Sequence, residues 1–346
     1  MMNKELFEKL LKTPSISGKE LYIQKMLIEE LKEIDDEVLT HHSYNTIHVV
    51  NKDSKIKVLL AAHIDEIGLI IEDILPNGIC KLTNVGAIRP EMYVGQKVNV
   101  VKFINNQYKY IPGVICYKAN NDKISTNDLI LDLGTFSKEE TLKLVSIGDV
   151  VIHQDNVTYL ENELITSRAL DDKISTFICC EVLRRIKSES KNGVYFASTV
   201  GEETTGRGST FTTSMVNPTI TITLDVGSSN DVAYYGDKVR DVTLGKGPMF
   251  TIASNGSEIL CNLLKQTAIK HHIPYQEVVE YSKTYTDFDT LYKQNGGIPS
   301  TLISIPLRYM HSSVEVGSLK DVEHTINLLV EFIKELDESV SFDPFK

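Results

Sequence analysis

The sequence predicts an α/β fold, in which a parallel or mixed sheet is flanked by helices and carries a small inserted β domain. Helix-like and strand-like segments alternate at both ends of the 346-residue chain. Between about Gly68 and Glu161 this alternation gives way to short β-type segments separated by Gly, Asn, Asp and Pro. We therefore expect a discontinuous α/β domain of residues 1–67 and 162–346, and an inserted barrel or sandwich of residues 68–161.

The N-terminal segment is expected to start the sheet. Residues 3–12 and 19–34 have apolar side chains at helical spacing, which predicts two amphipathic helices. Residues 46–50 predict a short strand, and the apolar run of residues 57–62 fits a strand buried in a parallel sheet. His63 follows that run directly, and the ends of strands are where open α/β sheets bind ligands.

The inserted segment is expected to be almost entirely β structure. Helical periodicity is nearly absent from it, apart from residues 137–144. The clearest strand candidates are residues 78–82, 97–103, 108–116 and 149–153.

Alternation of helices and strands returns after Leu170. The pattern predicts helices over residues 173–186 and 257–271 and strands over residues 193–200 and 219–225, with further elements over residues 274–280, 300–305 and 319–336. The same alternation on both sides of the insertion indicates that the flanking segments build one domain.

Composition and charge exclude several classes of function. Hydrophobic residues make up 42% of the chain and charged residues 24%, as in globular proteins. The net charge is −11 and no long Lys/Arg run is present, which argues against a nucleic-acid partner. No stretch approaches the ~20 apolar residues that span a bilayer, and no secretory signal is readable, so we expect no membrane partner.

The cysteines predict a reducing compartment. There are five, an odd number, and none has CxxC spacing. Cys179 and Cys180 are adjacent within a helical pattern and are expected to be small buried hydrophobic residues. We therefore expect a cytoplasmic location without a disulfide framework.

Five short motifs carry imidazole or carboxylate groups, namely AHIDEIG, RALDDK, GEETTGRG, LDVGS and RYMHSSVEV. In the first, His63 and Asp65 are two residues apart on an extended segment, so Asp65 can approach the imidazole. A carboxylate in that position orients a metal-bound histidine. A solvated acidic turn beside a structural histidine is the more frequent explanation of an isolated pair.

Glu202 and Glu203 follow the apolar strand of residues 194–200. Adjacent side chains cannot share one direction, so one can bind a metal ion while the other reaches a water molecule. That second carboxylate can take the proton of the water and return it to a departing amine. An ordinary charged loop is the simpler explanation of such a pair when it is taken alone.

The remaining candidates are weak singly. Asp225 ends an apolar strand and is either a ligand or a helix cap. His311 follows another strand, where a lone histidine is more often structural. Asp171 and Asp172 precede a helix-like run, and acidic pairs are common on solvated surfaces.

The combination is much stronger than any of its parts. Four of the five motifs lie at or just beyond the predicted C-terminal end of a strand, so their side chains are expected to meet. Imidazoles and carboxylates in these numbers suit a pocket for two ions such as Zn²⁺, Co²⁺ or Mn²⁺.

The chain resembles the M42 family of dinuclear metallo-aminopeptidases, which includes glutamyl and tetrahedral aminopeptidases. The resemblance covers nearly the whole chain, from PSISG through AHIDEIG, RALDDK, GEE and the LGKGPM stretch of residues 244–249 to IPLRYMHSSVEV. It implies a zinc-peptidase-like α/β fold with an inserted β-barrel-like domain. It also implies that this domain forms dimers, six of which assemble into a dodecamer, and that the substrates are short peptides.

The resemblance further implies two divalent metal ions in each subunit. His63 and Asp225 would hold one ion, Glu203 and His311 would hold the other, and Asp171 would bridge both.

It assigns the catalytic roles as well. Glu202 would be the general base and acid, Asp65 would orient His63, and Asp172 would follow Asp171 through a cis peptide bond.

Two segments depart from the family pattern. Residues 204–208 read TTGRG where VGLRG is common, and residues 284–288 read TYTDF where GGTDA is common. Both lie where the family selects its substrate side chain, so the preferred N-terminal residue is not predicted.

Two rival functions stand beside the aminopeptidase. An endoglucanase-type glycoside hydrolase needs carboxyl groups ~5–5.5 Å or ~6.5–9.5 Å apart across the glycosidic bond, which adjacent glutamates do not obviously supply. The absence of Trp also leaves fewer platforms for sugar stacking. A non-catalytic peptide-binding scaffold is the other rival.

Overall fold

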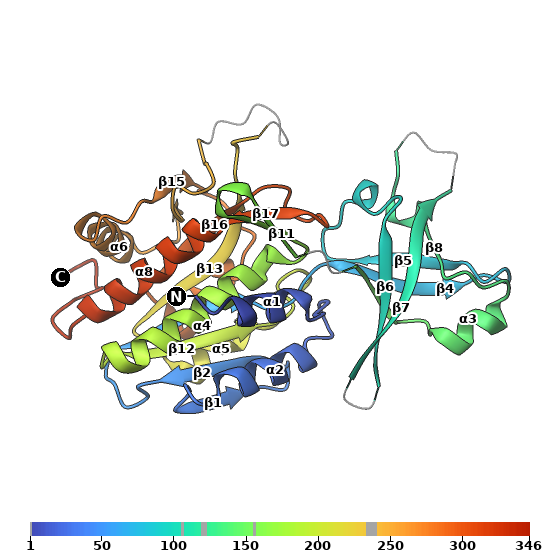
Figure 1. Ribbon diagram of the computed structural model, residues 1–346. Coiled ribbons are helices and arrows are strands. Elements are labelled where there is room, and N and C mark those ends of the chain that lie inside the picture. The colour runs from blue at the N-terminus through green and yellow to red at the C-terminus, as the bar shows by residue number, and fades with distance from the viewer. Residues whose placement is uncertain (1, 105–106, 119–122, 155–156, 233–240) are drawn as a thin grey trace.

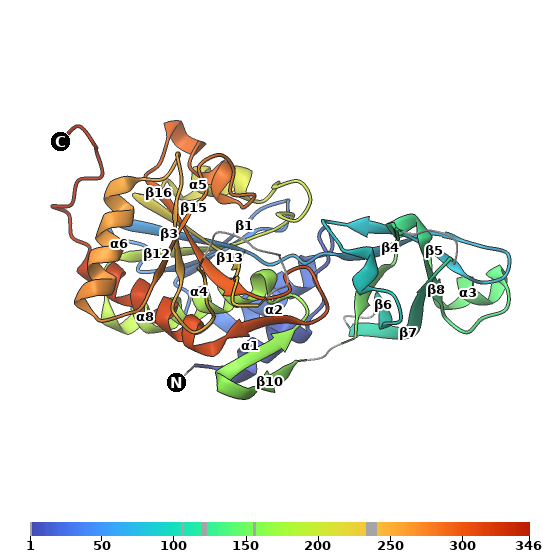
Figure 2. The same ribbon diagram turned by 90° about the horizontal axis from the view of Figure 1, so that it is seen from above.

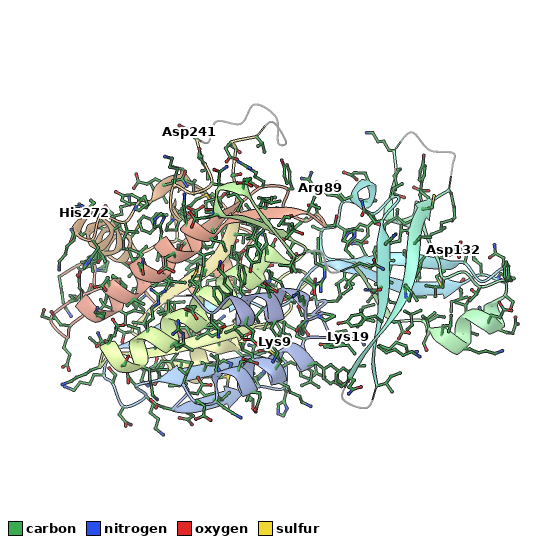
Figure 3. All side chains as sticks on the ribbon, viewed as in Figure 1. Lys9, Lys19, Arg89, Asp132, Asp241 and His272 are labelled. Atoms are coloured by element: carbon green, nitrogen blue, oxygen red, sulfur yellow. The ribbon has the colours of Figure 1, made fainter. Side chains whose placement is uncertain are left out.

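The computed structural model describes residues 2–104, 107–118, 123–154, 157–232 and 241–346. Figure 1 shows a body of sheet and helices beside a smaller group of strands, and the view from above in Figure 2 shows the same separation. Lys19, labelled in Figure 3, lies where the two parts face each other. The predicted fold class, a mixed sheet with an inserted barrel, is confirmed.

The larger part contains an eight-stranded mixed sheet, which with its covering helices we call the sheet body. Its strands, in spatial order, are β1 (Glu37–Thr40), β2 (Thr46–Val50), β12 (Gly193–Thr199), β3 (Lys57–His63), β13 (Ile220–Ser228), β16 (Ser300–Leu307), β14 (Met249–Ile252) and β15 (Gln276–Val279). The four strands β12, β3, β13 and β16 are mutually parallel. Their carboxyl ends therefore meet at one edge of the sheet.

Helices cover both faces of this sheet because the side chains of each strand alternate. Val58 and Leu60 of β3 belong to one apolar cluster, whereas Leu59 and Ala61 belong to another. The first cluster packs against α1 (Lys4–Lys12), α2 (Leu21–Leu31), α4 (Leu170–Glu189), α6 (Glu258–Lys270) and α8 (Leu319–Glu335). The second packs against α5 (Ser209–Val216) and α7 (Phe288–Leu291).

The smaller part is a closed barrel, as its strand pairing shows. Its strands, in spatial order, are β4 (Gly68–Ile74), β5 (Cys80–Val85), β8 (Leu129–Asp132), β7 (Gln107–Tyr117), β6 (Lys97–Ile104) and β9 (Val150–His153). Pairing of β4 with β9 closes the ring, and α3 (Lys138–Leu144) packs outside it. Inward-facing apolar residues such as Leu69, Val100 and Leu131 give the barrel its own core.

A three-stranded sheet lies beside the sheet body. It consists of β10 (Thr158–Leu160), β11 (Leu164–Ser167) and β17 (Glu315–Ser318), all antiparallel. Residues 158–160, near the end of the expected insertion, therefore pair with β11, a strand outside the barrel. Short 3₁₀ turns occur at Pro90–Met92, Thr126–Asp128, Glu161–Glu163 and Gln294–Gly296.

Several elements differ from the sequence-based expectation. Strands β1 and β14 and helix α5 were not anticipated, because β1 and β14 have four residues each and α5 is rich in Ser and Thr. Regular helical geometry in α4 begins after Asp172, as expected, because Asp171 and Asp172 have non-helical dihedral angles. No helix among the described residues is both long enough and apolar enough to cross a membrane. All five cysteines are free.

Candidate metal centre

The parallel strands place the predicted residues side by side. His63, the last residue of β3, pairs in register with Thr199, the last residue of β12, and Glu202 and Glu203 follow three and four residues later. Thr223 of β13 pairs with Ala61, so Asp225 lies at the same level as His63 two residues later. The strand register alone therefore brings three of the predicted motifs to one edge of the sheet.

Asp171 lies between the two candidate histidines. Its Oδ1 atom is 3.1 Å from Nε2 of His63, and its Oδ2 atom is 3.2 Å from Nε2 of His311. Its peptide bond to Asp172 is cis, as expected. One carboxylate thus faces two imidazoles with two different oxygen atoms, which is the arrangement expected of a bridging ligand.

The ring of His63 is oriented by Asp65 in an unexpected way. Its Nδ1 atom is 3.0 Å from the main-chain oxygen of Asp65 and 3.7 Å from the side-chain Oδ1 atom. The carbonyl, and not the carboxylate, therefore makes the hydrogen bond to the imidazole. The carboxylate of Asp65 instead accepts hydrogen bonds from the main-chain N–H groups of Glu202 and Glu203, at 3.1 and 3.3 Å.

The ring of His311 is fixed in the same manner. Its Nδ1 atom is 2.9 Å from the main-chain oxygen of Ala87, in the segment that joins β5 and β6. Its Nε2 atom is 3.8 Å from Oε2 of Glu203. Since both histidines donate Nδ1–H to a carbonyl, each neutral ring has its Nε2 lone pair directed at the carboxylates.

Two overlapping groups in this cluster have the ligand spacing of a metal site. The candidate ligand atoms of His63, Asp171 and Glu203 lie within 4.8 Å of one another, as do those of His63, Asp172 and Asp225. Asp172 was expected to support the site without binding, yet its carboxylate lies in the second group.

Burial makes the negative charge of this cluster costly. Loss of solvation raises the pKa of Glu202 to about 9 and that of Asp225 to about 7, and neighbouring carboxylates add to both shifts. Burial and the charge of Asp171 likewise raise the pKa of Glu203 well above its usual range.

The pKa values of His63 and Asp171 shift in the directions that favour their charged forms. Burial opposes protonation of His63, but the hydrogen bond to Asp171 and the charges of Glu202 and Asp225 raise its pKa well above the usual range. Burial also acts to raise the pKa of Asp171, but hydrogen bonds to both imidazoles hold it below its usual value. The cluster therefore attracts positive charge, either as protons or as cations.

These residues fit divalent cations. Lone pairs of Nε2 and carboxylate oxygens face each other at 3.1 and 3.2 Å, which is repulsive unless positive charge lies between them. Oε1 of Glu203 is buried and has no hydrogen-bond partner among the described residues. Imidazole and carboxylate ligands together suit Zn²⁺, Co²⁺ and Mn²⁺.

A cleft of about 480 Å³ opens beside the cluster and is lined in part by His63, Asp171, Glu202, Asp225 and His311. Side chains of three neighbouring strands also line it, namely Met249 and Thr251 of β14, Val278 of β15, and Leu302 and Ser304 of β16. Met249 pairs with Ser304, and Thr251 with Val278, so these side chains share one face of the sheet. The candidate centre is therefore open to a ligand on that side.

Some residues of the site were not found from the sequence. Glu315 is 2% exposed and accepts hydrogen bonds from the main-chain N–H groups of Asp171 and His311. Asp287 accepts a hydrogen bond from the hydroxyl of Thr199. Glu315 lies in the RYMHSSVEV motif and Asp287 in the TYTDF segment, but nothing in the residue spacing indicates these contacts.

The sequence profile of the M42 glutamyl aminopeptidase family matches residues 45–328. A lysyl aminopeptidase of Pyrococcus furiosus is 30% identical over 352 residues, which cover 99% of this chain and 100% of the relative.

Solved structures show the same fold over nearly the whole chain. A TET aminopeptidase from Thaumarchaeota archaeon SCGC AB-539-E09 has a TM-score of 0.89 at 27% identity and covers 97% of this chain and 98% of its own. The Pyrococcus horikoshii TET1 peptidase, which can assemble into a tetrahedron or a large octahedral shell, has a TM-score of 0.83 at 28% identity. It covers 96% of this chain and 99% of its own.

Proposed function

This chain belongs to the M42 glutamyl aminopeptidase family, and we propose that it is a metal-dependent aminopeptidase acting on short peptides. It removes the N-terminal residue by hydrolysis of the first peptide bond, with two divalent ions, Zn²⁺ or Co²⁺ or alternatively Mn²⁺, in each subunit. The observation that carries this proposal is the position of Asp171 between His63 and His311.

Two ligand sets share that carboxylate. His63 and Asp225, with 3.9 Å between Nε2 and Oδ1, would hold one ion, and Glu203 and His311 would hold the other. When bound, two such ions polarise the scissile carbonyl and make a water molecule acidic enough to attack it near neutral pH. The main-chain carbonyls of Asp65 and Ala87 support this assignment because they leave Nε2 of each histidine as the ligand atom.

Glu202 carries the proton in this mechanism. Its side chain is 14% exposed and lines the cleft, with Oε2 at 3.9 Å from Nε2 of His63. It accepts a proton from the attacking water and then donates that proton to the departing amine. To accept a proton it must be ionised, which requires nearby positive charge to offset burial and the charges of Asp225 and Asp171.

Asp65 keeps Glu202 in place for this step. Its two carboxylate oxygens receive the N–H groups of Glu202 and Glu203 separately, so the short segment between β12 and α5 cannot rotate freely. Through its main-chain carbonyl the same residue orients His63. Asp65 therefore acts as a positioning residue.

The assembly and the division of the chain are also proposals. We expect residues 68–161 to form the dimerisation domain and residues 1–67 and 162–346 to form the catalytic domain. Six dimers then build a dodecamer, in keeping with the tetrahedral assembly of the Pyrococcus horikoshii relative. A cytoplasmic location stays a prediction from the sequence.

The direct test is a panel of Leu, Lys, Glu and Ala chromogenic amides, assayed with purified protein after removal of metal and again after addition of Zn²⁺, Co²⁺ or Mn²⁺. The proposal requires hydrolysis of at least one amide that depends on the added ion. Chelator-resistant cleavage of cellulose would support the endoglucanase instead. Peptide binding without any hydrolysis would support the non-catalytic scaffold.

A further inference from the structure

The carboxylate of Glu315 contacts two of the proposed ligand residues through their main chains. Oε1 accepts the N–H of His311 at 2.8 Å, and Oε2 accepts the N–H of Asp171 at 3.1 Å. Glu315 is 2% exposed, so these hydrogen bonds are shielded from water. Each oxygen has its own donor, and the two donors belong to segments 140 residues apart in sequence (311 − 171).

Both segments adopt backbone conformations that need support. Ala169, two residues before Asp171, has φ of 56°, and Tyr309 and His311 have φ of 58° and 63°. Non-glycine residues rarely occupy this left-handed region, and they persist there only where surrounding contacts hold them. The N–H of His311 itself is among the groups that Glu315 binds.

Glu315 itself belongs to a β-strand of the three-stranded sheet. It is the first residue of β17 and pairs with Ser167, the last residue of β11. From Ser167 the chain continues through Arg168 to Asp171. On the other side, Val316 forms an antiparallel β-bridge with Arg308, three residues before His311. The three-stranded sheet therefore presents one carboxylate between the two segments that carry Asp171 and His311.

We propose that Glu315 is a positioning residue that holds the backbones of Asp171 and His311 at the separation required for a shared metal site. This inference rests on the proposed function, because it assumes that those two side chains bind metal ions. Glu315 itself belongs to neither candidate ligand group formed by the described residues around His63. It acts through the main chain of the ligand residues.

Substitution by glutamine tests the geometry. Glu315→Gln keeps the length and one acceptor oxygen but replaces the other oxygen with an amide that cannot accept an N–H. Glu315→Asp keeps the charge but draws both oxygens back by one methylene group. Both changes leave every proposed metal ligand in the chain.

Asp321 provides a matched control. It is fully buried, and its two oxygens accept the N–H groups of Gly245 and Gly247, both at 2.7 Å. Asp321→Asn therefore disrupts a carboxylate that likewise accepts two main-chain N–H groups, but neither of these belongs to a proposed ligand.

The experiment is a titration of metal-free full-length protein with Co²⁺, followed by calorimetry and by the visible absorption of bound Co²⁺. We expect the wild type and Asp321→Asn to bind two ions alike. Glu315→Gln and Glu315→Asp should bind at least one ion roughly 10–100-fold more weakly, the range for losing a group that orients a ligand, with an altered Co²⁺ spectrum.

Each alternative result has a definite meaning. Wild-type affinity and spectrum in both Glu315 variants overturn the positioning role while leaving the proposed function intact. An equal loss in Asp321→Asn also overturns it, because the effect is then general destabilisation. If the wild type binds no Co²⁺, both the proposed metal-dependent function and this inference are wrong.

Hydrogen exchange keeps the test decisive if both Glu315 variants fail to fold. In the metal-loaded wild type the amides of Asp171 and His311 should exchange slowly, since both are bound by a buried carboxylate. If these two amides exchange as fast as those of exposed loops, Glu315 does not hold the two backbones in place.

Discussion

The carboxylate of Asp65 lies 3.1 Å from the main-chain nitrogen of Glu202 and accepts its hydrogen bond. The sequence suggested that this carboxylate would bind the imidazole of His63, but the carbonyl of Asp65 does so instead. One residue thus connects the proposed proton carrier and a proposed ligand through different groups. Replacement of the Asp65 side chain changes the contact with Glu202 and keeps the carbonyl contact with His63.

Asp65→Asn should disturb the position of Glu202 more than the orientation of the His63 ring. The substitution keeps the main-chain carbonyl but places an amide donor opposite one of the N–H groups of Glu202 and Glu203. We expect kcat to fall roughly 10–100-fold, with a smaller change in Co²⁺ affinity. Steady-state kinetics and calorimetry measure the two effects.

Asp289→Asn is the matched control for that change. Asp289 also accepts two main-chain N–H groups, those of Thr284 and Tyr285, which line the cleft but are not proposed ligands. Asp289→Asn should therefore bind Co²⁺ with the affinity of the wild type. Wild-type kcat in Asp65→Asn would refute the role assigned to its carboxylate.

Glu202→Gln should abolish proton transfer without disturbing the metal ions. Glutamine has nearly the same shape but cannot accept the proton of the attacking water. We expect kcat to fall by about 10²–10⁴-fold at unchanged metal content. Metal analysis and kinetics on one preparation check both statements, and substantial residual kcat in the metal-loaded variant rules out this assignment.

Asp171→Asn should weaken binding of both ions together. Its two oxygens face different histidines, so loss of the negative charge affects both ligand sets. The loss should exceed the roughly 10–100-fold that follows removal of a group that only orients a ligand. Calorimetric titration should also show the two binding events becoming independent.

Asp172→Asn distinguishes the roles of the adjacent carboxylates. Asp172 lies with His63 and Asp225 only, so its replacement should affect one ion at most. If cooperative binding is lost in Asp172→Asn and kept in Asp171→Asn, the two assignments must be exchanged.

Glu66 should contribute to stability above pH 4.5 and lose that contribution in acid. It is buried and contacts Arg168, the ammonium group of Lys173 at 3.0 Å and the N–H of Ser15. Burial acts to raise its pKa, but the charges of Arg168 and Lys173 outweigh burial and lower it from 4.5 to about 2. The folded state therefore binds the proton less tightly than the unfolded state, so stability falls as the pH drops from 4.5 towards 2.

Glu66→Gln tests this dependence in metal-free protein. At neutral pH the variant leaves two buried cations without their carboxylate, and it should be less stable by roughly 3–5 kcal/mol. The difference from the wild type should shrink as the pH approaches 2. Urea denaturation across pH 2–7 gives both curves, and parallel curves would contradict the prediction.

Much of the fold could be predicted because it depends on local patterns. The boundaries of β2 agree with the sequence-based expectation, and the apolar run before His63 forms the buried parallel strand β3. The closed barrel follows the change in pattern after Gly68. Helix α5 and strand β14 escaped prediction because tertiary packing stabilises segments whose own sequences are weakly biased.

The meeting of the side chains of His63, Glu202, Glu203 and Asp225 could be predicted from the sequence, because the carboxyl ends of parallel strands lie at one edge of a sheet. Their metal-binding and catalytic roles stay predictions. The three-dimensional structure was needed to show that the carboxylates of Asp65 and Glu315 bind main-chain N–H groups. Such contacts join residues as much as 144 positions apart, and a hydrogen bond is made or lost within a few tenths of an ångström. Residue spacing carries no information on that scale.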